Sequence, residues 1–174
     1  MEAKNSFNLT LGTSIIWLAI AFVWSLNIKA YDKSVSTFIV GGFMLPFAFH
    51  ISKIIRTTWT MKGNLLQPLG LWLNFAQLFY FPFLVFTHLK SPDYFVRVYA
   101  NIACAYFFPY AWFYKTNLFS IFAGLISIGS LLIALFATPE NMYLIPLMMS
   151  AALVTLTILL YMDSSRKANW IIEL

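Results

Sequence analysis

Six long runs of apolar residues, separated by short polar segments, account for most of this 174-residue chain. A helix needs about 20 mostly apolar residues to cross the ~30 Å hydrocarbon layer of a bilayer, and each run is long enough. The pattern therefore predicts an all-α fold, an integral membrane helical bundle of one domain with six transmembrane helices at residues 9–28, 35–55, 66–86, 92–114, 118–137 and 139–162. Residues 163–174 are predicted to form a polar tail.

Two connections between these runs contain residues that favour the start of a helix. Residues 91–93 read Ser-Pro-Asp and residues 138–140 read Thr-Pro-Glu. The hydroxyl is expected to accept a hydrogen bond from a free backbone N–H, the proline fits the first helical position, and the carboxylate is favoured near the positive end of the helix dipole. Asp93 and Glu140 are therefore interpreted as structural acids and not as catalytic ones.

The composition supports a membrane location. Hydrophobic residues make up 61% of the chain and charged residues 10%, whereas a soluble domain carries about 25% charged residues. Of the 11 Lys and Arg residues, seven fall on the side of the two termini and four on the other side. The positive-inside rule then predicts a multi-pass protein of the cell membrane with both termini, and the polar tail, in the cytoplasm.

The charge and the cysteine content narrow the choice of partners. The net charge is +5, but the cations form no dense patch on a soluble face, so no nucleic acid partner is expected. Membrane lipids are expected partners, because cations near a bilayer attract anionic headgroups. Cys104 is the one cysteine of the chain, so an internal disulfide is excluded.

Polar residues form stripes on the third and fourth runs. Gln67, Asn74 and Gln77 follow helical spacing on the third run, and Arg97, Asn101 and Cys104 do so on the fourth. Two antiparallel helices place Gln77 and Asn101 at a similar depth. Because an unpaired carboxamide is costly in hydrocarbon, we expect both stripes to face each other or a cavity. The alternative is that these side chains serve only as hydrogen bonds between helices.

Other side chains at the same depth complete a candidate ligand site. Tyr106 and Tyr110, with Tyr80, are expected to form its aromatic walls. His50, near the inner end of the second run, is placed to bond Gln67. Arg97 either reaches the outer headgroups or binds an anionic ligand.

Neither catalysis nor metal binding is indicated by the pattern of reactive residues. His50 and His88 lie at opposite membrane faces, so they cannot share a metal, and no metal or cofactor is expected. Away from the helix starts, no Asp or Glu lies within a run, so no catalytic residue is assigned. Pro109 is expected to kink its helix, because it removes a backbone hydrogen bond. Small residues on the fifth run are interpreted as a packing face: Ser120, Ala123, Gly124, Ser127, Ser130 and Ala134.

Short motifs are spread over the second, third and fourth runs: Gly41-Gly42 with Met44, Pro46 and Lys53, Gly63-Asn64 with Leu69-Gly70, and Pro109-Tyr110 with Trp112 and Tyr114. In these motifs, over roughly residues 16–132, the chain resembles a family of small bacterial multispan membrane proteins catalogued as a domain of unknown function. The resemblance implies a bacterial inner-membrane protein. It implies no activity, cofactor or site residue.

The function that these observations favour is the binding or passage of a small, partly apolar molecule through a cavity within the bundle. The expected ligand-binding residues share a polar or aromatic character and a position on the second, third or fourth run: His50, Gln67, Asn74, Gln77, Arg97, Asn101, Tyr106 and Tyr110. One alternative is a membrane enzyme that acts on a lipid or an isoprenoid, which the missing carboxylates disfavour. The other is a structural or partner subunit of a membrane complex, and a homo-oligomer is left open as a partner.

Overall fold

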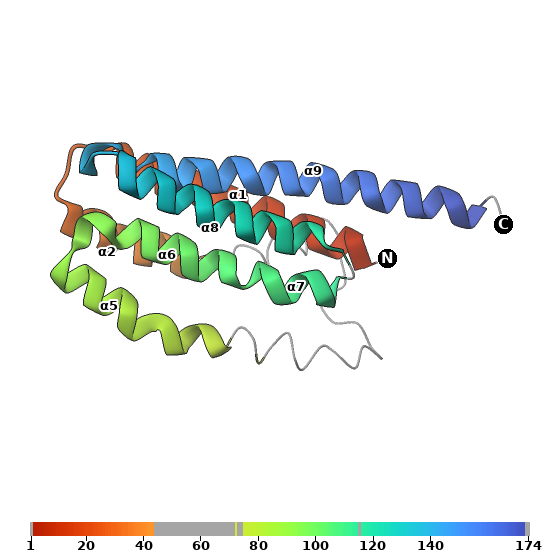
Figure 1. Cartoon of the computed structure of the whole chain (residues 1–174), viewed down its shortest axis with the longest axis horizontal. Coiled ribbons are helices and arrows are strands. Elements are labelled where there is room, and N and C mark those ends of the chain that lie inside the picture. Colours follow the sequence, from red (N-terminus) through yellow and green to blue (C-terminus); the bar gives the residue numbers. More distant parts are fainter. Residues whose placement is uncertain (1, 44–71, 73–74, 115, 173–174) are drawn as a thin grey trace.

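The described part of the chain is built from helices. The computed structural model describes residues 2–43, 72, 75–114 and 116–172, and no strand occurs among them. Figure 1 shows the helices lying side by side along one axis. In chain order they are α1 (Glu2–Ser25), α2 (Ala30–Gly42), the 3-10 helix η1 (Gln77–Tyr80), α5 (Phe81–Lys90), η2 (Pro92–Tyr94), α6 (Phe95–Ala105), α7 (Phe107–Phe113), α8 (Leu118–Phe136), η3 (Pro139–Asn141) and α9 (Leu144–Ile172). The all-α prediction is confirmed for these residues.

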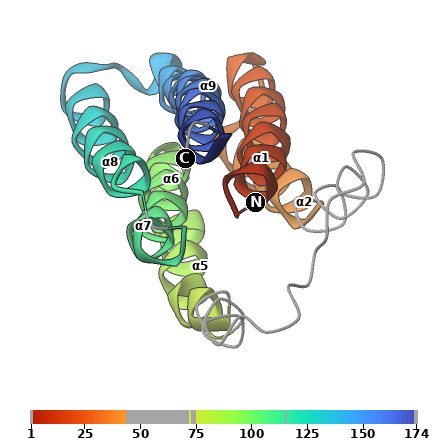
Figure 2. The ribbon, with the colours of Figure 1, turned by 90° about the vertical axis from the view of Figure 1, so that its right-hand side faces the viewer.

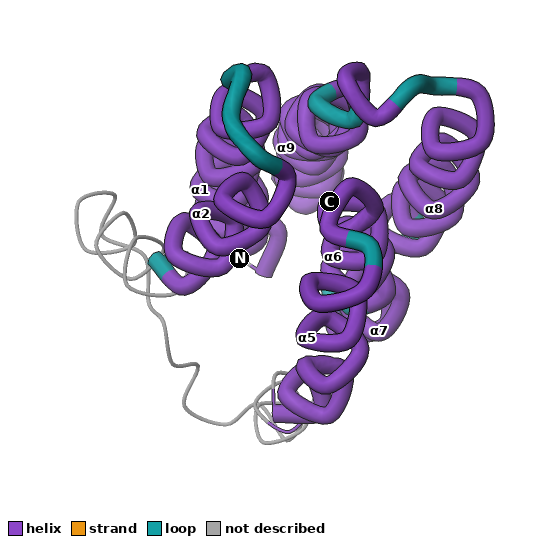
Figure 3. Tube along the Cα trace, turned by 90° about the vertical axis from the view of Figure 1, so that its left-hand side faces the viewer, coloured by secondary structure: helices purple, strands orange, loops and turns teal. Residues whose placement is uncertain are grey.

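The helices are arranged in two branches that meet at α9. Viewed along the bundle axis, α9 lies between α1 and α8 (Figure 2). On one side α2 packs against α1, and on the other α6 and α7 pack against α8, with α5 against α6. Figure 3 shows the opposite end, where short connections join α1 to α2 and α8 to α9. The first helix begins and the last helix ends at the same end of the bundle, and α9 projects beyond its neighbours (Figure 1).

The core of the bundle lies along the contact between α1 and α9. Trp17 and Ile20 of α1 are buried there, as are Leu153 and Leu156 of α9. A fully buried leucine or isoleucine side chain stabilises a fold in water by about 1.5–3 kcal/mol, whereas packing between helices in lipid depends more on close contact and on polar bonds.

Hydroxyl groups join the same two helices. Ser150 Oγ donates a hydrogen bond to the carbonyl oxygen of Ser14 at 2.9 Å. Seven residues later on α9, Thr157 Oγ1 lies 2.8 Å from Thr10 Oγ1 of α1. All four residues are buried. Small hydroxyl residues at a helix contact let the backbones approach and supply polar bonds, which is typical of helix pairs in membranes.

The corner between α1 and α2 is fixed by a lysine. Lys33 Nζ donates to the carbonyl of Trp24, one residue before α1 ends, at 3.0 Å, and lies 5.8 Å from the centroid of the indole ring. Trp24 Nε1 in turn donates to Thr37 Oγ1 at 2.9 Å. The last carbonyls of a helix lack partners and carry partial negative charge, so an ammonium group is stabilising in this position.

The fifth predicted run is reproduced closely. It was expected at residues 118–137, and α8 spans Leu118–Phe136. Ala123, Ser130 and Ala134 of the predicted packing face are buried. Gly124 is exposed, and a Cβ atom added there would meet nothing within 4 Å. The packing face within the chain therefore excludes Gly124.

The third and fourth predicted runs are interrupted. The fourth, expected at residues 92–114, begins with η2 and is divided at Tyr106 into α6 and α7. Pro109 has no N–H to donate to the carbonyl of Ala105, which lies four residues earlier, and the helix is interrupted next to that carbonyl. The bend expected at Pro109 stays a prediction. The described part of the third, expected to end at residue 86, changes from η1 to α5 and continues to Lys90.

The predicted hydroxyl caps at residues 91 and 138 are wrong. Neither hydroxyl makes a capping hydrogen bond. The backbone N–H of Tyr94 donates to the carbonyl of Ser91 at 3.1 Å, and that of Asn141 donates to the carbonyl of Thr138 at 2.9 Å. A tight 3-10 turn thus uses the carbonyl of the residue before the proline, and the side chain is not needed. The proline and the acid of each turn lie where they were expected.

The end of the chain also differs from its prediction. The helix that was expected at residues 139–162 begins as α9 at Leu144 and continues through residues 163–172, which were expected to form a separate polar tail. This segment contains no glycine and no proline, so nothing in its sequence stops a helix.

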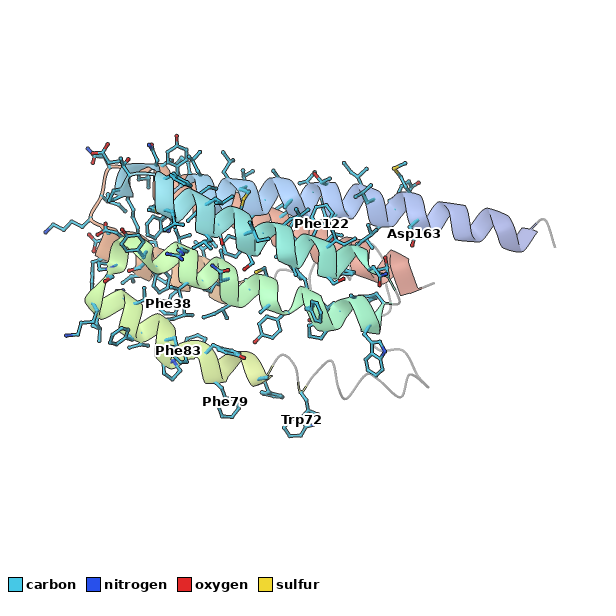
Figure 4. All side chains as sticks on the ribbon, viewed as in Figure 1. Phe38, Trp72, Phe79, Phe83, Phe122 and Asp163 are labelled. Atoms are coloured by element: carbon cyan, nitrogen blue, oxygen red, sulfur yellow. The ribbon has the colours of Figure 1, made fainter. Side chains whose placement is uncertain are left out.

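Two described helical stretches are long and apolar enough to cross a membrane. One is α8, Leu118–Phe136, and the other is Pro139–Asp163, which comprises η3 and most of α9. Buried helices of soluble proteins share this property, so the outer surface adds a separate observation. Phe79 is 82% exposed and Phe136 is 84% exposed, and Figure 4 shows Phe79 and Trp72 pointing away from the bundle. The bundle therefore presents large apolar side chains to its surroundings.

Candidate functional site

Asn101 lies in a closed hydrogen-bond network between α6 and α8. Its Nδ2 atom donates to the carbonyl of Arg97 at 3.0 Å and to Ser130 Oγ at 3.1 Å, and its Oδ1 atom accepts from Ser127 Oγ at 2.9 Å. Ser130 Oγ donates to the carbonyl of Ser127 at 2.9 Å. Every hydrogen of these amide and hydroxyl groups has an acceptor, so the network holds the helices together and leaves no donor for a ligand.

This network corrects the expected partner of Asn101. The sequence placed Asn101 opposite the third run or against a cavity, and the structure pairs it with the serines of α8. Ser127 and Ser130 lie at the depth of Asn101 in the neighbouring helix, and their small side chains allow the close helix contact that such bonds need. The alternative reading of Asn101, as a hydrogen bond between helices, is the one that the structure supports.

Arg97 lies one turn before Asn101 on α6, near the end of the bundle that holds the connection between α5 and α6. Its side chain is half-buried. No ion pair joins it to an acid among the residues that the structure describes. Both readings of Arg97, as a residue that reaches headgroups or as one that binds an anion, stay predictions.

Three tyrosines gather where α6 gives way to α7. Tyr80 is the last residue of η1, Tyr106 lies at the break itself, and Tyr110 lies on α7. Burial is the main influence on the Tyr106 phenol, and Tyr80 and Tyr110 are the ionisable groups that also influence it. We call these three residues the tyrosine cluster. Their role as the aromatic walls of a site stays a prediction.

The hydroxyl of Tyr106 is the feature that distinguishes this cluster. It is buried and has no hydrogen-bond partner among the described residues. A buried hydroxyl without a partner costs about 1–3 kcal/mol, and such groups are rare in folded proteins. An isolated donor of this kind, held beside two further phenols, indicates a position where a molecule outside the chain could bind.

The break at Tyr106 has a cause in the local sequence. Pro109 interrupts the backbone hydrogen-bond pattern of the fourth run, so the chain leaves the axis of α6 at Ala105 and resumes as α7 at Phe107. Tyr110 packs against the buried Phe119 of α8, with ring centroids 6.1 Å apart. The aromatic ring of Tyr110 is thereby held in place beside the break.

Several predicted site residues cannot be placed. His50, Gln67 and Asn74 lie outside the described residues. Gln77 begins η1, but its side chain is outside the described part as well. Their predicted roles stay predictions, and the cluster described above does not depend on them.

A second polar contact was missed by the sequence analysis. Ser34 Oγ of α2 lies 2.6 Å from His88 Nδ1 of α5, and the same hydroxyl donates to the carbonyl of Tyr31 at 2.7 Å. Because a hydroxyl has one hydrogen, Ser34 either donates it to the Tyr31 carbonyl and accepts from the imidazole N–H, or donates it to Nδ1. The ring also lies 4.2 Å from the ring of Tyr31 and meets Phe38 edge-on. The sequence predicts that the start of the second run and the end of the third lie on one side of the bundle, but no local pattern pairs Ser34 with His88.

Metal binding has no support within the described residues. They contain no group of three or more His, Cys, Asp or Glu side chains that could hold an ion. Cys104 is buried, and its thiol donates to the carbonyl of Asn101 at 3.2 Å. It therefore bonds within its own helix, α6, and its side chain belongs to the buried core.

These features define an all-helical bundle with an apolar outer surface and with amide and hydroxyl bonds between its helices. The chain belongs to a family of unknown function, DUF7010, whose model matches residues 1–163. The predicted membership of an uncharacterised family is confirmed over a longer stretch than the motifs covered. No curated protein and no solved structure matches the chain. The bacterial origin implied by the resemblance stays a prediction.

Proposed function

We propose that this chain is an integral membrane protein with six spans, both termini in the cytoplasm, and a binding site for a small, partly apolar molecule at the tyrosine cluster. The distribution of side chains supports the membrane location. Ser34, Thr37 and Ser130 are fully buried, whereas Phe79 and Phe136 face outward. Soluble proteins rarely expose such a large apolar surface, and a bilayer would cover it.

The common direction of the termini supports the proposed topology. The first helix starts and the last helix ends at one end of the bundle (Figure 1), as an even number of spans requires. A cysteine at Lys4 and a cysteine at Lys90, each in a Cys104→Ser background, would test the orientation. We expect a membrane-impermeant maleimide to label the Lys90→Cys variant in intact cells and the Lys4→Cys variant only after permeabilisation. Labelling of both in intact cells would contradict the topology.

The observation that carries the binding site is the buried hydroxyl of Tyr106, which has no hydrogen-bond partner in the described part of the chain. A chain that buries such a group accepts its cost unless a bound molecule supplies the missing hydrogen bond. The aromatic rings of Tyr80 and Tyr110 would contact the apolar part of that molecule. Passage of the molecule through the bundle would use the same site.

Native mass spectrometry of the protein purified in a mild detergent tests this function. We expect a small molecule to remain bound to the wild type and to be reduced in the Tyr106→Phe variant. Tyr143→Phe is the matched control, because Tyr143 lies in the turn just before α9, outside the cluster, and is also half-buried. A wild type without any bound molecule, in detergent and in lipid nanodiscs, would contradict the proposal.

A further inference from the structure

The charges around Tyr106 restrict the chemistry of the ligand, provided that the proposed binding site is real. The Tyr106 hydroxyl has no hydrogen-bond partner among the described residues, so no described lysine or arginine bonds it. Arg97 lies nine residues earlier, about 13 Å along the helix axis at ~1.5 Å per residue.

An anionic ligand would be poorly held at this position. Charge that is removed from water is costly unless a cation and further hydrogen bonds compensate it. Phenol groups can donate hydrogen bonds to an anion, but they do not neutralise its charge. A carboxylate or a phosphate would therefore bind at an end of the bundle, where the lysines and Arg97 lie, and not at the tyrosine cluster.

A neutral oxygen meets the needs of the site. The free hydrogen of Tyr106 requires an acceptor, and a carbonyl oxygen offers two lone pairs without a charge. Tyr80 is 49% exposed, so its ring can move toward a bound molecule at little cost in packing. Its hydroxyl comes from η1, a different element from the one that holds Tyr106, so two donors can approach one oxygen from two sides.

We infer that the ligand is a neutral apolar molecule with a carbonyl oxygen, which accepts a hydrogen bond from Tyr106 and lies against the rings of Tyr80 and Tyr110. The inference names the class of ligand for the proposed site. It excludes fatty-acid anions and phosphate headgroups as the molecules bound there.

Three probes of equal chain length test the inference on the full chain in lipid nanodiscs: 2-undecanone, undecane and undecanoate. Binding is measured by equilibrium dialysis, with empty nanodiscs subtracted. We expect 2-undecanone to bind the wild type about tenfold more tightly than the Tyr106→Phe variant, the size of one buried hydrogen bond. Undecane should bind both proteins equally, and undecanoate should bind at least tenfold more weakly than the ketone. The Tyr143→Phe variant should bind all three probes as the wild type does.

Two results would overturn the inference and leave the proposed function intact. One is equal binding of 2-undecanone to the wild type and to Tyr106→Phe, while the co-purified molecule is lost from the variant. The other is tighter binding of undecanoate than of the ketone at the same site. If no probe binds and no molecule co-purifies with the wild type, the proposed function itself fails.

Discussion

Two regions of the molecule, the contact between α6 and α8 and the tyrosine cluster, differ in whether their buried polar groups are hydrogen-bonded. At the first, Asn101 is bonded through both ends of its amide to Ser127 and Ser130. At the second, five residues further along the chain, the hydroxyl of Tyr106 is buried and has no partner among the described residues. Both places lie within the fourth predicted run.

We interpret the bonded groups as stabilising the fold and the unbonded hydroxyl as a group that a ligand would bond. A closed network contributes to stability, and removing any member leaves another group unpaired. An unpaired group weakens the fold, and removing it relieves a cost. Stability measurements on matched variants can therefore tell the two kinds of site apart, because the sign of the change differs.

The largest effect is expected in the packed region between α2 and α6. A Cβ atom at Gly41 would collide with the ring of Tyr99, which packs against Trp17 and Phe95. Gly41→Ala should therefore lower the free energy of unfolding by about 2 kcal/mol. Gly42 is the matched control, because a Cβ atom there meets nothing within 4 Å. Denaturant titration in detergent micelles measures both variants. Equal effects at the two glycines would show that Gly41 is not packed tightly against Tyr99. The difference in stability between this packed region and the tyrosine cluster would then be smaller than expected.

The closed network should respond next. Asn101→Ala should lower the free energy of unfolding by about 1–2 kcal/mol, near the upper end for polar bonds between membrane helices. Ser130→Ala should cost less, because Ser127 still bonds the amide. The double variant should lose less than the sum of the single losses, since the two residues share a hydrogen bond. Strict additivity in this cycle would mean that the network is not closed in the membrane.

A smaller loss is expected at the contact between α2 and α5. His88→Phe keeps an aromatic ring beside Tyr31 and Phe38 but removes the nitrogen that bonds Ser34. It should lower the free energy of unfolding by about 0.5–1 kcal/mol. Ser34→Ala should give a similar loss, and the two changes together should cost little more than one. An unchanged stability in both single variants would show that the aromatic contacts alone hold α5 against α2.

The sequence was sufficient for the helical class, for the limits of α8 and for the break near Pro109, because each depends on residues close together in the chain. It was not sufficient for the partner of Asn101. Helical spacing identifies which residues share a face, but the choice between the third and the fifth run depends on how the helices pack. The contact of Ser34 with His88 joins residues 54 positions apart, and no local pattern marks it. For the site, the role of the three tyrosines as walls stays a prediction, and the missing partner of Tyr106 among the described residues became visible only when the neighbouring side chains were placed.

The smallest change, and the one with the opposite sign, is expected at Tyr106. Tyr106→Phe removes a buried hydroxyl that has no partner and keeps the ring that fills the space. The free energy of unfolding of the ligand-free protein should rise by about 0.5–1 kcal/mol, because the cost of burying an unpaired polar group disappears. Addition of 2-undecanone should then stabilise the wild type more than the variant, since a ligand stabilises the form that binds it. Tyr80→Phe serves as the comparison, because its half-exposed hydroxyl carries no such cost and its loss should leave the ligand-free stability unchanged. A drop in stability on Tyr106→Phe would mean that the hydroxyl is bonded within the folded chain. The tyrosine cluster would then stabilise the fold, as the Asn101 network does, and would not be a binding site.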